Sequence, residues 1–337
     1  MPTVSSGHDG RRLWAATLFA PALVAVVLTM FAWPASRLAP HDLPIGVAGP
    51  AAVATGVAQS LTEAAGPDAF DVHRYADEAA AREAIRDREV YGAVVAGPGG
   101  VTLLTASAAS PLVSGLMTQA LTEQAAGADP AMRPRVVDVV PTTADDPRGV
   151  VFGSALLPLV MAGLVTGALF GLRTRPGVKQ AVAILVSSAL AGLVVAGIAQ
   201  GWLGALGGDW WVNATAAGLT VLAIAAAVAG AVAVVGVAGA GLVAVLLMVV
   251  GNPLSGVTSA PELLPRWAGV TGQLLPPGAG GTLLRGTSFF DGAGGGRPLV
   301  VLGVWAVVGL TCVLLGALRR HGDPVEPARH TATAAAA

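Results

Sequence analysis

Long stretches of the chain carry no charged side chain, and their lengths predict where the backbone crosses a membrane. A spanning helix needs about 20 apolar residues. Four uncharged runs each have the length of one crossing: 13–36, 149–172, 180–208 and 298–318. A fifth run, 210–261, has about 52 residues and would be about 78 Å long as one helix, far longer than the hydrocarbon core of about 30 Å. It is predicted to hold two crossings, with a turn at the glycine-rich stretch 235–241.

The chain is therefore predicted to fold as an α-helical polytopic membrane protein with one inserted extracytoplasmic α/β domain. A short N-terminal segment, 1–12, precedes the spans, and a disordered cytoplasmic tail, 319–337, follows them. The first apolar run is longer than the core of about 7–15 residues in a signal peptide, which favours a retained anchor over a cleaved signal. The six expected transmembrane helices are 13–33, 150–172, 179–199, 213–234, 238–254 and 298–318.

Basic residues near the span ends predict the orientation, because lysine and arginine concentrate in short cytoplasmic loops. With both termini inside, every short cytoplasmic end except the uncharged 236–241 turn is basic, through Arg11, Arg12, Arg173, Arg175, Lys179, Arg319 and Arg320. Outside lie 34–149, the loop 201–212 and the segment 251–297. The strong preference for arginine over lysine favours a bacterial source and hence the bacterial cell membrane.

The segment 34–149 is richer in charged residues than the predicted spans, and its pattern predicts the α/β domain. Apolar and alternating stretches between turn residues indicate strands, and two stretches with N-cap residues, Asp77 and Ser110, indicate helices. The resulting order β-α-β-α-β-β-α-β is typical of a small two-layer domain. The expected strands are 43–48, 70–75, 90–96, 101–107 and 135–140, and the expected helices are 50–65, 77–89 and 110–124.

Composition narrows the functional class. Of the 337 residues, 54% are hydrophobic and only 12% are charged, which is about half the charge of a soluble protein. A net charge of −1 gives no reason to expect a nucleic-acid partner. The single cysteine, Cys312, excludes an internal disulfide or a thiolate cluster.

No motif predicts catalysis, a metal site or a cofactor. His41 and His73 lack companions at metal-ligand spacing, and the turn at 97–100 lies between two strands rather than before a helix. No G-x-x-x-x-G-K-[ST] sequence occurs, so the chain has no ATPase motif of its own. All six expected spans lack ionisable residues, which disfavours an ion-coupled carrier. The polar residues Gln200 and Asn213 are expected to lie at the membrane interface rather than to contact a substrate.

Three glycines in the second expected span indicate close helix packing. Gly163, Gly167 and Gly171 are spaced four apart, as in a doubled G-x-x-x-G stripe. The stripe fits either a subunit interface or packing against another span of the same chain.

The turn 172–179 on the cytoplasmic side is short, basic and stiffened by proline. It fits a docking element for a cytoplasmic partner, or an orientation signal alone. Its candidate residues are Arg173, Arg175, Pro176, Gly177 and Lys179.

The segment 251–297 is too apolar for an exposed loop, yet prolines interrupt it. This pattern favours half-helices that dip into the outer leaflet over a loop lying on its surface, since broken backbone at membrane depth is tolerated when protein covers it. Its candidate residues are Asn252, Pro253, Trp267, Pro276, Pro277 and Arg285.

Four stretches resemble the type-2 ABC exporter permeases, and among them the phage-infection-protein (YhgE/Pip-like) branch. They are Leu-Pro-Ile-Gly-Val at 43–47, the stretch 77–92 ending Arg-Glu-Val-Tyr-Gly, Gly-Asn-Pro-Leu-Ser-Gly at 251–256, and the stretch 265–290. The resemblance extends over about residues 10–320, and departs from the family where Ala-Gly-Pro follows the first strand. It implies a homo- or heterodimeric permease bound to a separate ATP-binding-cassette ATPase. It also implies ATPase coupling through 173–179 and an outer gate in 251–297.

The leading hypothesis is therefore a permease subunit of an exporter that moves an amphipathic or apolar substrate and takes its energy from another chain. One alternative is a non-transporting surface protein, a receptor or secretion scaffold, that acts through residues 41–145. A second is a secondary carrier or channel, which the uncharged spans weaken.

Overall fold

Five helices in the computed structural model are long and apolar enough to cross a membrane. The structure describes residues 6–50, 55–56, 59–60, 63, 66–97, 100–124 and 134–320. Within these, the five stretches are Thr17–Ser36, Val150–Arg173, Val178–Trp202, Trp210–Val235 and Gly296–Leu318. They fit a membrane-embedded protein and agree with five of the six predicted spans.

The remaining predicted span, 238–254, is the fifth in chain order and corresponds to a shorter apolar helix, Val237–Gly251. It consists of α8 (Val237–Val245) followed by the π-helical turn η3 (Leu246–Gly251). The predicted glycine-rich turn before it is confirmed but is tighter than expected. The preceding helix ends at Val235, and Gly236 alone reverses the chain in a left-handed backbone conformation with φ 77°.

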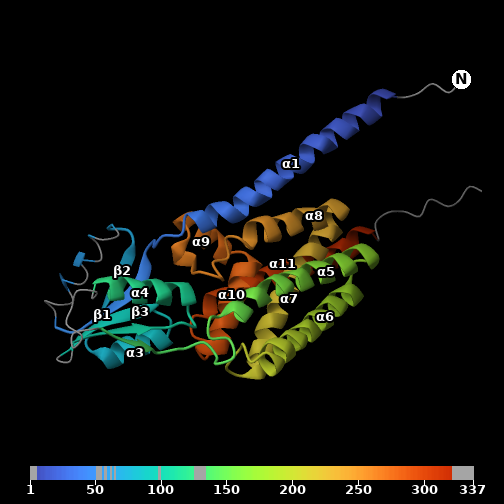
Figure 1. The fold of residues 1–337 in the computed structure, drawn as a ribbon. Helices are drawn as coiled ribbons and strands as arrows, with labels where there is room; N and C mark the ends of the chain where they lie inside the picture. The colour runs from blue at the N-terminus through green and yellow to red at the C-terminus, as the bar shows by residue number, and fades with distance from the viewer. Residues whose placement is uncertain are drawn as a thin grey trace, which may run out of the picture.

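The helices meet in a bundle with two distinct ends (Figure 1). The strands lie at one end, here called the sheet end, and the N-terminus of α1 (Ser6–Ser36) and the C-terminus of α11 (Gly296–Arg320) point to the opposite end. The turn between α5 (Val150–Arg173) and α6 (Val178–Ala196) is also at the opposite end, because a Cβ on its Gly177 would lie 3.6 Å from Ala317 of α11.

Helix α7 (Trp210–Val235) is the centre of the bundle, and α5, α6, α10 and α11 surround it (Figure 1). Small side chains allow this, since 61% of its apolar window is buried, against 28% in α5 and α11. Backbone packs directly on backbone at several points. Gly192 of α6 contacts Ala214, and Gly309 of α11 contacts Ala226.

The glycine stripe of α5 packs within the chain. A Cβ on Gly163 would lie 2.6 Å from the Cβ of Ile224, and a Cβ on Gly171 would lie 3.2 Å from the Cα of Ala229. A Cβ on Gly167 would lie 2.6 Å from the carbonyl oxygen of Ala225. Of the two alternatives for this stripe, the structure has the intramolecular one, with α7 as the partner.

The sheet region between α1 and α5 contains one five-stranded sheet with the order β2-β1-β3-β4-β5. All neighbours are parallel except the β3–β4 hairpin. The predicted strands are confirmed with shifts of a few residues at their ends. The strands are β1 (Leu43–Ala48), β2 (Phe70–Tyr75), β3 (Gly92–Gly97), β4 (Gly100–Thr105) and β5 (Arg135–Asp138).

Both predicted caps of the sheet region are present. Asp77 accepts a hydrogen bond from the backbone N of Ala80 at 2.9 Å and begins α3 (Glu78–Arg86). Ser110 accepts one from Val113 at 3.2 Å and begins α4 (Pro111–Gln124). Much of the predicted helix 50–65, the tip of the hairpin at 98–99, and the tail from 321 on lie outside the described residues.

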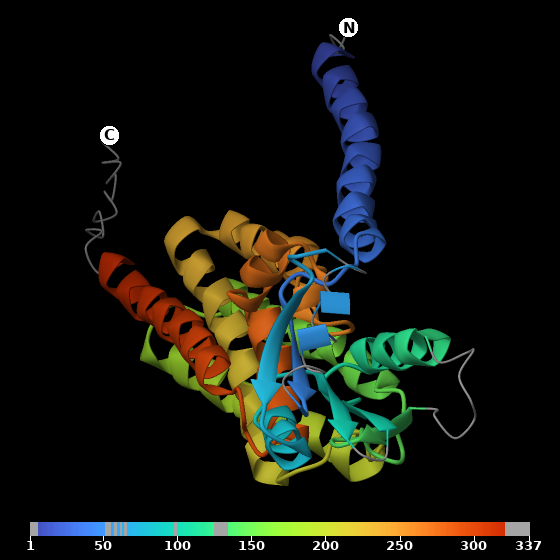
Figure 2. The same cartoon turned by 90° about the vertical axis from the view of Figure 1, so that its left-hand side faces the viewer.

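Helix α1 stands apart from the bundle over most of its length, as both views show (Figures 1 and 2). Only 6% of its apolar window is buried. The apolar window lies at 17–36, closer to the sheet region than the predicted 13–33, and the predicted N-terminal segment is helical from Ser6. Near its end Trp33 stacks on Trp267, with 5.6 Å between ring centroids.

The segment after η3 folds into short helices that pack into the bundle. These are the 3-10 turn η4 (Pro261–Leu263), α9 (Arg266–Gln273) and α10 (Pro276–Phe289). Gly280 of α10 contacts Thr220, which is about ten residues, or about 15 Å, along α7 from its start. The indole Nε1 of Trp305 in α11 donates to the carbonyl oxygen of Leu274 at 3.0 Å. Helix α10 therefore lies beside the spanning helices rather than on top of them.

The close approach of α5 and α7 predicts a specific sensitivity. Gly167→Ala places a methyl group against Ala225 and Val228 and should lower the free energy of unfolding by about 1–3 kcal/mol, as overpacking does. Gly303→Ala in α11 is the matched control, because a Cβ there meets nothing within 4 Å. Thermal unfolding of the two variants in mild detergent makes the comparison. Equal melting temperatures would contradict the packing.

Candidate functional site

A cavity of about 760 Å³ lies where the sheet region meets the bundle. The end of α1, the start of α5, the loop 252–259 and the loop before α4 all contribute to its lining. Apolar side chains come mainly from the two helices, through Phe31, Leu38, Phe152, Leu156 and Leu157. The loops add hydroxyl and amide groups, and two arginines, Arg148 and Arg285, also line the cavity, whereas none of its described lining residues is an aspartate or glutamate.

Arg285 lies at the buried side of this cavity and is held by backbone carbonyls. Only 7% of its surface is exposed. Its Nη2 donates to the carbonyl oxygen of Val257 at 2.6 Å, and its Nη1 donates to that of Ala109. Its guanidinium carbon lies 4.7 Å from the ring centroid of Phe152, a cation–π contact. Arg285 thus joins α10 to the loop before α4 and to the start of α5.

The positive charge of Arg285 has no acidic counterpart in the described part of the chain. None of the ion pairs found there includes it. Burial is the main reason that the pKa of Arg285 is lowered to about 10; Tyr91 opposes this shift, and the nearby charge of Arg88 adds a smaller lowering. The guanidinium is still charged at neutral pH, so the cavity carries a buried positive charge.

Arg148 stands at the mouth of the cavity and is exposed. The acid next to it in sequence is engaged elsewhere. The Oδ1 of Asp146 accepts from the backbone N of Val150 at 2.9 Å, and its Oδ2 accepts from that of Phe152 at 3.0 Å. Asp146 therefore caps the first turn of α5 and is turned away from Arg148.

The sheet region is fastened to the segment 251–297 by buried polar contacts. The hydroxyl of Tyr91 donates to Oε2 of Glu262 at 2.7 Å, and Ser110 Oγ donates to the carbonyl oxygen of Ser259 at 2.5 Å. Arg88 donates to the carbonyl oxygen of Thr282 at 3.2 Å. Burial first, and Glu262 second, hold the pKa of Tyr91 well above its usual value, so this hydroxyl stays a donor.

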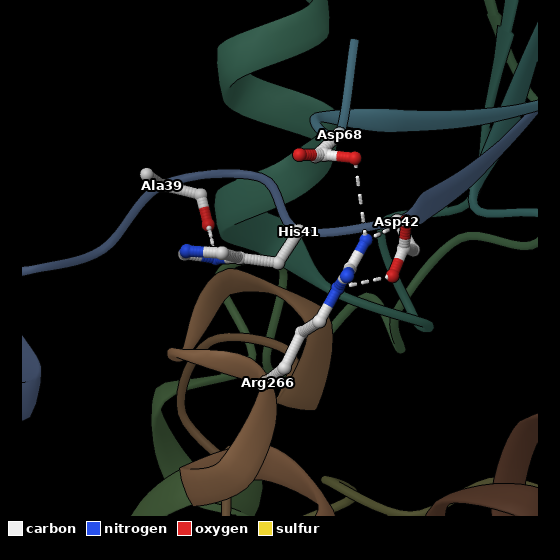
Figure 3. Close-up of polar contacts among 5 residues, drawn as sticks. All are labelled: Ala39, His41, Asp42, Asp68 and Arg266. Atoms are coloured by element: carbon white, nitrogen blue, oxygen red, sulfur yellow. Dashed lines mark hydrogen bonds and ion pairs between the residues drawn. The ribbon is translucent and has the colours of Figure 1, made fainter. Parts of the chain in front are cut away.

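A second fastening is exposed and is drawn in Figure 3. Arg266 at the start of α9 pairs with Asp42 at 2.6 Å and reaches Asp68 at 3.7 Å. Beside it the His41 ring lies 2.7 Å from the carbonyl oxygen of Ala39. Because both partners of the ion pairs are in solvent, these contacts orient α9 and add little stability.

Asn213, predicted to lie at the membrane interface, is buried within the protein near the start of α7. It is 0% exposed, and its Nδ2 donates to the carbonyl oxygen of Gly207 at 2.6 Å and to Oε1 of Gln200 at 2.9 Å. Its Oδ1 accepts from Thr287 at 2.7 Å and from Ser288 at 3.1 Å. The side chain ties the end of α10 to α7 and to the loop before it. The sequence placed it at a span end, but only the fold brings α10 beside it.

The residues predicted for the outer segment fall into three places. Asn252, Pro253 and Arg285 line the cavity. Pro276 and Pro277 are buried at the start of α10, where Pro277 contacts Gly251 of η3. Trp267 is 57% exposed and stacks on α1 instead.

The predicted cytoplasmic turn lies at the other end of the bundle, far from the cavity along the helices. Arg173, Arg175 and Lys179 are exposed, and no ion pair in the described residues includes them. Pro176 packs on α11, since a Cβ on Gly316 would lie 3.3 Å from its Cβ. The side chain of Gln180 reinforces the turn by donating to the carbonyl oxygen of Phe170 at 2.7 Å.

Several residues that shape the cavity or the fastening carried no signal in the sequence. Arg148, Phe152, Tyr91 and Glu262 match no spacing rule, and their partners are distant in the chain. The stretch containing Tyr91 was marked by its resemblance to the exporter family and by the strand predicted at 90–96, neither of which indicates a contact with Glu262.

The buried network around Asn213 predicts a loss of stability. Asn213→Ala removes the acceptor of the Ser288 hydroxyl, while the Thr287 hydroxyl keeps the carbonyl oxygen of Leu284, and it should lower the free energy of unfolding by about 1–3 kcal/mol for the unsatisfied group. Thr215→Ala, on the exposed side of α7, is the control and should change it by less than about 0.5 kcal/mol. Thermal unfolding in detergent separates the two, and equal effects would contradict the network.

Comparison with protein-family models, with curated proteins and with solved structures gives no match to this chain. Function is therefore inferred from the residues and contacts described above.

Proposed function

We propose that the protein is the permease subunit of an ABC-type exporter, energised by a separate ATP-binding-cassette ATPase. The observation that carries the proposal is the two-ended construction of the bundle. An exposed basic turn packs against α11 at one end, and a mixed apolar and cationic cavity lies at the other. Helix α7 runs between them and contacts the elements that form both.

The proposed topology has six crossings with both termini in the cytoplasm. The short helix Val237–Gly251 is the fifth crossing, and the sheet region is extracytoplasmic. The helix Val237–Gly251 has about 15 residues and is about 22 Å long. It therefore crosses only where the bilayer is locally thinned, or where the adjoining loop at 252–256 enters the membrane with it. The π-helical turn η3 lies at this junction, and such turns are frequent at functional sites.

The basic turn is the proposed contact with the ATPase. Its three cationic side chains are free of ion pairs in the described structure, while Pro176 and Gly177 are held against α11. A force on the turn would therefore be transmitted to α11 and to α7, which packs along it. Rigid elements with direct backbone contact suit such transmission.

The segment 251–297 is the proposed outer gate. Helix α10 is re-entrant in this proposal, because it packs beside α7 at membrane depth and its C-terminal part is tied through Arg285 and through Asn213 of α7. Since the sheet region is fastened to the same segment through Glu262 and Ser259, movement of α10 would move the sheet region with it.

A dimer of permeases, homo- or heteromeric, completes the proposal. The glycine stripe of α5 is occupied by α7 and is not the dimer surface. The exposed apolar faces of α1 and α8, including Leu18, Leu28, Val237 and Leu242, remain for lipid or a second subunit.

The proposed fifth crossing, by the helix Val237–Gly251, predicts a labelling pattern. In a Cys312→Ala background, Val178→Cys and Val237→Cys should both be shielded from an impermeant thiol reagent in intact cells, because both lie on the cytoplasmic side. Each valine is exposed in the structure, at 68% and 72% respectively. Asp68→Cys in the sheet region should be labelled. Arg297→Cys, exposed and beyond this helix in the chain, should be labelled like Asp68→Cys, and its shielding would remove the fifth crossing.

The proposed coupling turn predicts an ATPase dependence. The full chain, purified in mild detergent, should retain a Walker-motif ATPase whose activity it stimulates. Arg173→Ala/Arg175→Ala/Lys179→Ala should reduce this stimulation by more than about tenfold, a loss of about 1.4 kcal/mol of coupling.

The matched control removes three exposed arginines at the sheet end: Arg37, Arg74 and Arg297. It should leave the stimulation unchanged, and thiol labelling confirms that both variants keep their orientation. Repeated absence of any ATPase would sink the proposal, and activity retained by the isolated sheet region would favour a receptor or scaffold instead.

A further inference from the structure

The cavity at the sheet end has one apolar and one positively charged part, which together favour a particular class of ligand. Its described lining combines an apolar wall from α1 and α5 with two arginines and includes no carboxylate. Its volume of about 760 Å³ is within the range of about 300–1,000 Å³ typical of small-molecule sites.

We propose that this cavity binds an anionic amphiphile drawn from the membrane, with its acidic headgroup between Arg148 and Arg285 and its hydrocarbon chain between α1 and α5. The inference rests on the proposed function, for which it names the class of substrate. A free anion such as phosphate fits less well, because it has no hydrocarbon chain to pack against the apolar wall.

The charge of the cavity selects the headgroup. A guanidinium has five N–H donors, and the carbonyls of Ala108, Ala109 and Val257 use at most three of those of Arg285. Donors are left for an anion, and phosphate and carboxylate match the guanidinium geometry. Asp146, the acid nearest to Arg148 in sequence, is occupied in capping α5. On its other side, Arg148 lines a neighbouring hollow with Glu123 and Asp138. A bound anion would supply the counter-charge within the cavity itself, where the described lining has no acid.

The apolar rim of the cavity selects the rest of the molecule. Phe31 of α1 and Leu157 of α5 both line the cavity, yet they are 43% and 45% exposed. Their exposed faces continue along the helices through Leu28 and Met161. Because α1 stands away from the bundle, a chain lying against these residues would pass directly into the surrounding lipid (Figure 2).

The two arginines have different tasks in this arrangement. Arg148 is exposed at the mouth and attracts the headgroup, while Arg285 is fixed by carbonyls and by Phe152 and receives it. Arg148 is therefore the residue to change, since its side chain makes no ion pair in the described structure and its loss does not disturb the buried contacts.

The test measures lipid binding by the full chain in non-ionic detergent. Native mass spectrometry compares phosphatidylglycerol with phosphatidylcholine carrying the same acyl chains, and inorganic phosphate serves as the free-anion arm. We expect phosphatidylglycerol to bind at least tenfold more tightly than phosphatidylcholine, and inorganic phosphate to compete only weakly. Arg148→Glu should remove this preference, whereas the control Arg297→Glu, exposed at the same end but outside the cavity, should keep it.

Equal binding of the two lipids, or an unchanged preference in Arg148→Glu, would overturn the inference, as would competition by phosphate as strong as that of the lipid. Arg285→Lys adds a second variant that keeps the charge but loses the planar fork, and it should weaken phosphatidylglycerol binding without abolishing it. The outcome is separate from that of the ATPase experiment. An ATPase partner without lipid selectivity removes only this inference, and selective binding without an ATPase removes only the proposed function.

Discussion

Most of the structure depends on how closely the neighbouring helices approach α7. Apolar side chains give little drive for helices to associate within lipid, so packing must come from close contact of backbones. Alanine and glycine make this contact possible on three sides, through Gly167 of α5, Gly192 of α6 and Gly309 of α11. The absence of charge in α7 fits the same constraint, because a helix surrounded by other helices has no water to hydrate a charge.

This packing also decides where polar groups can sit. The two polar ties of α10 lie towards its C-terminal end, where Arg285 binds carbonyls and Thr287 binds Asn213. Between them and Pro276 the helix relies on glycines against Thr220 and Val257. The middle of α10 also contributes Ala279, Leu283 and Leu284 to the main core of the bundle. The sheet region is tied to the same segment through Glu262 and Ser259.

The sequence predicted the elements better than their contacts. Charge-free runs located five long helices, and alternation located the five strands, because both signals are local and periodic. The length of Val237–Gly251 was overestimated, since a run of apolar residues does not show where the helix gives way to a turn. Burial of Asn213 was missed for a different reason. Its partners Thr287 and Ser288 are more than about 70 residues away, and no spacing rule links positions so far apart.

The sequence singled out Arg285 as a candidate residue but could not show its contacts, because these too come from residues far away in the chain. In a proline-broken apolar segment an arginine is expected to reach the surface, since a buried charge without a partner is costly. The fold instead surrounds it with carbonyls and one aromatic ring, which satisfy its hydrogen bonds but leave its charge without an acid. The carbonyls and the aromatic ring offset part of the free-energy cost of removing the guanidinium from water. These contacts alone would fit a purely structural arginine or lysine equally well. What a structural role does not explain is the placement of that charge on the wall of a cavity that has a second arginine at its mouth and no carboxylate among the lining residues that the structure describes.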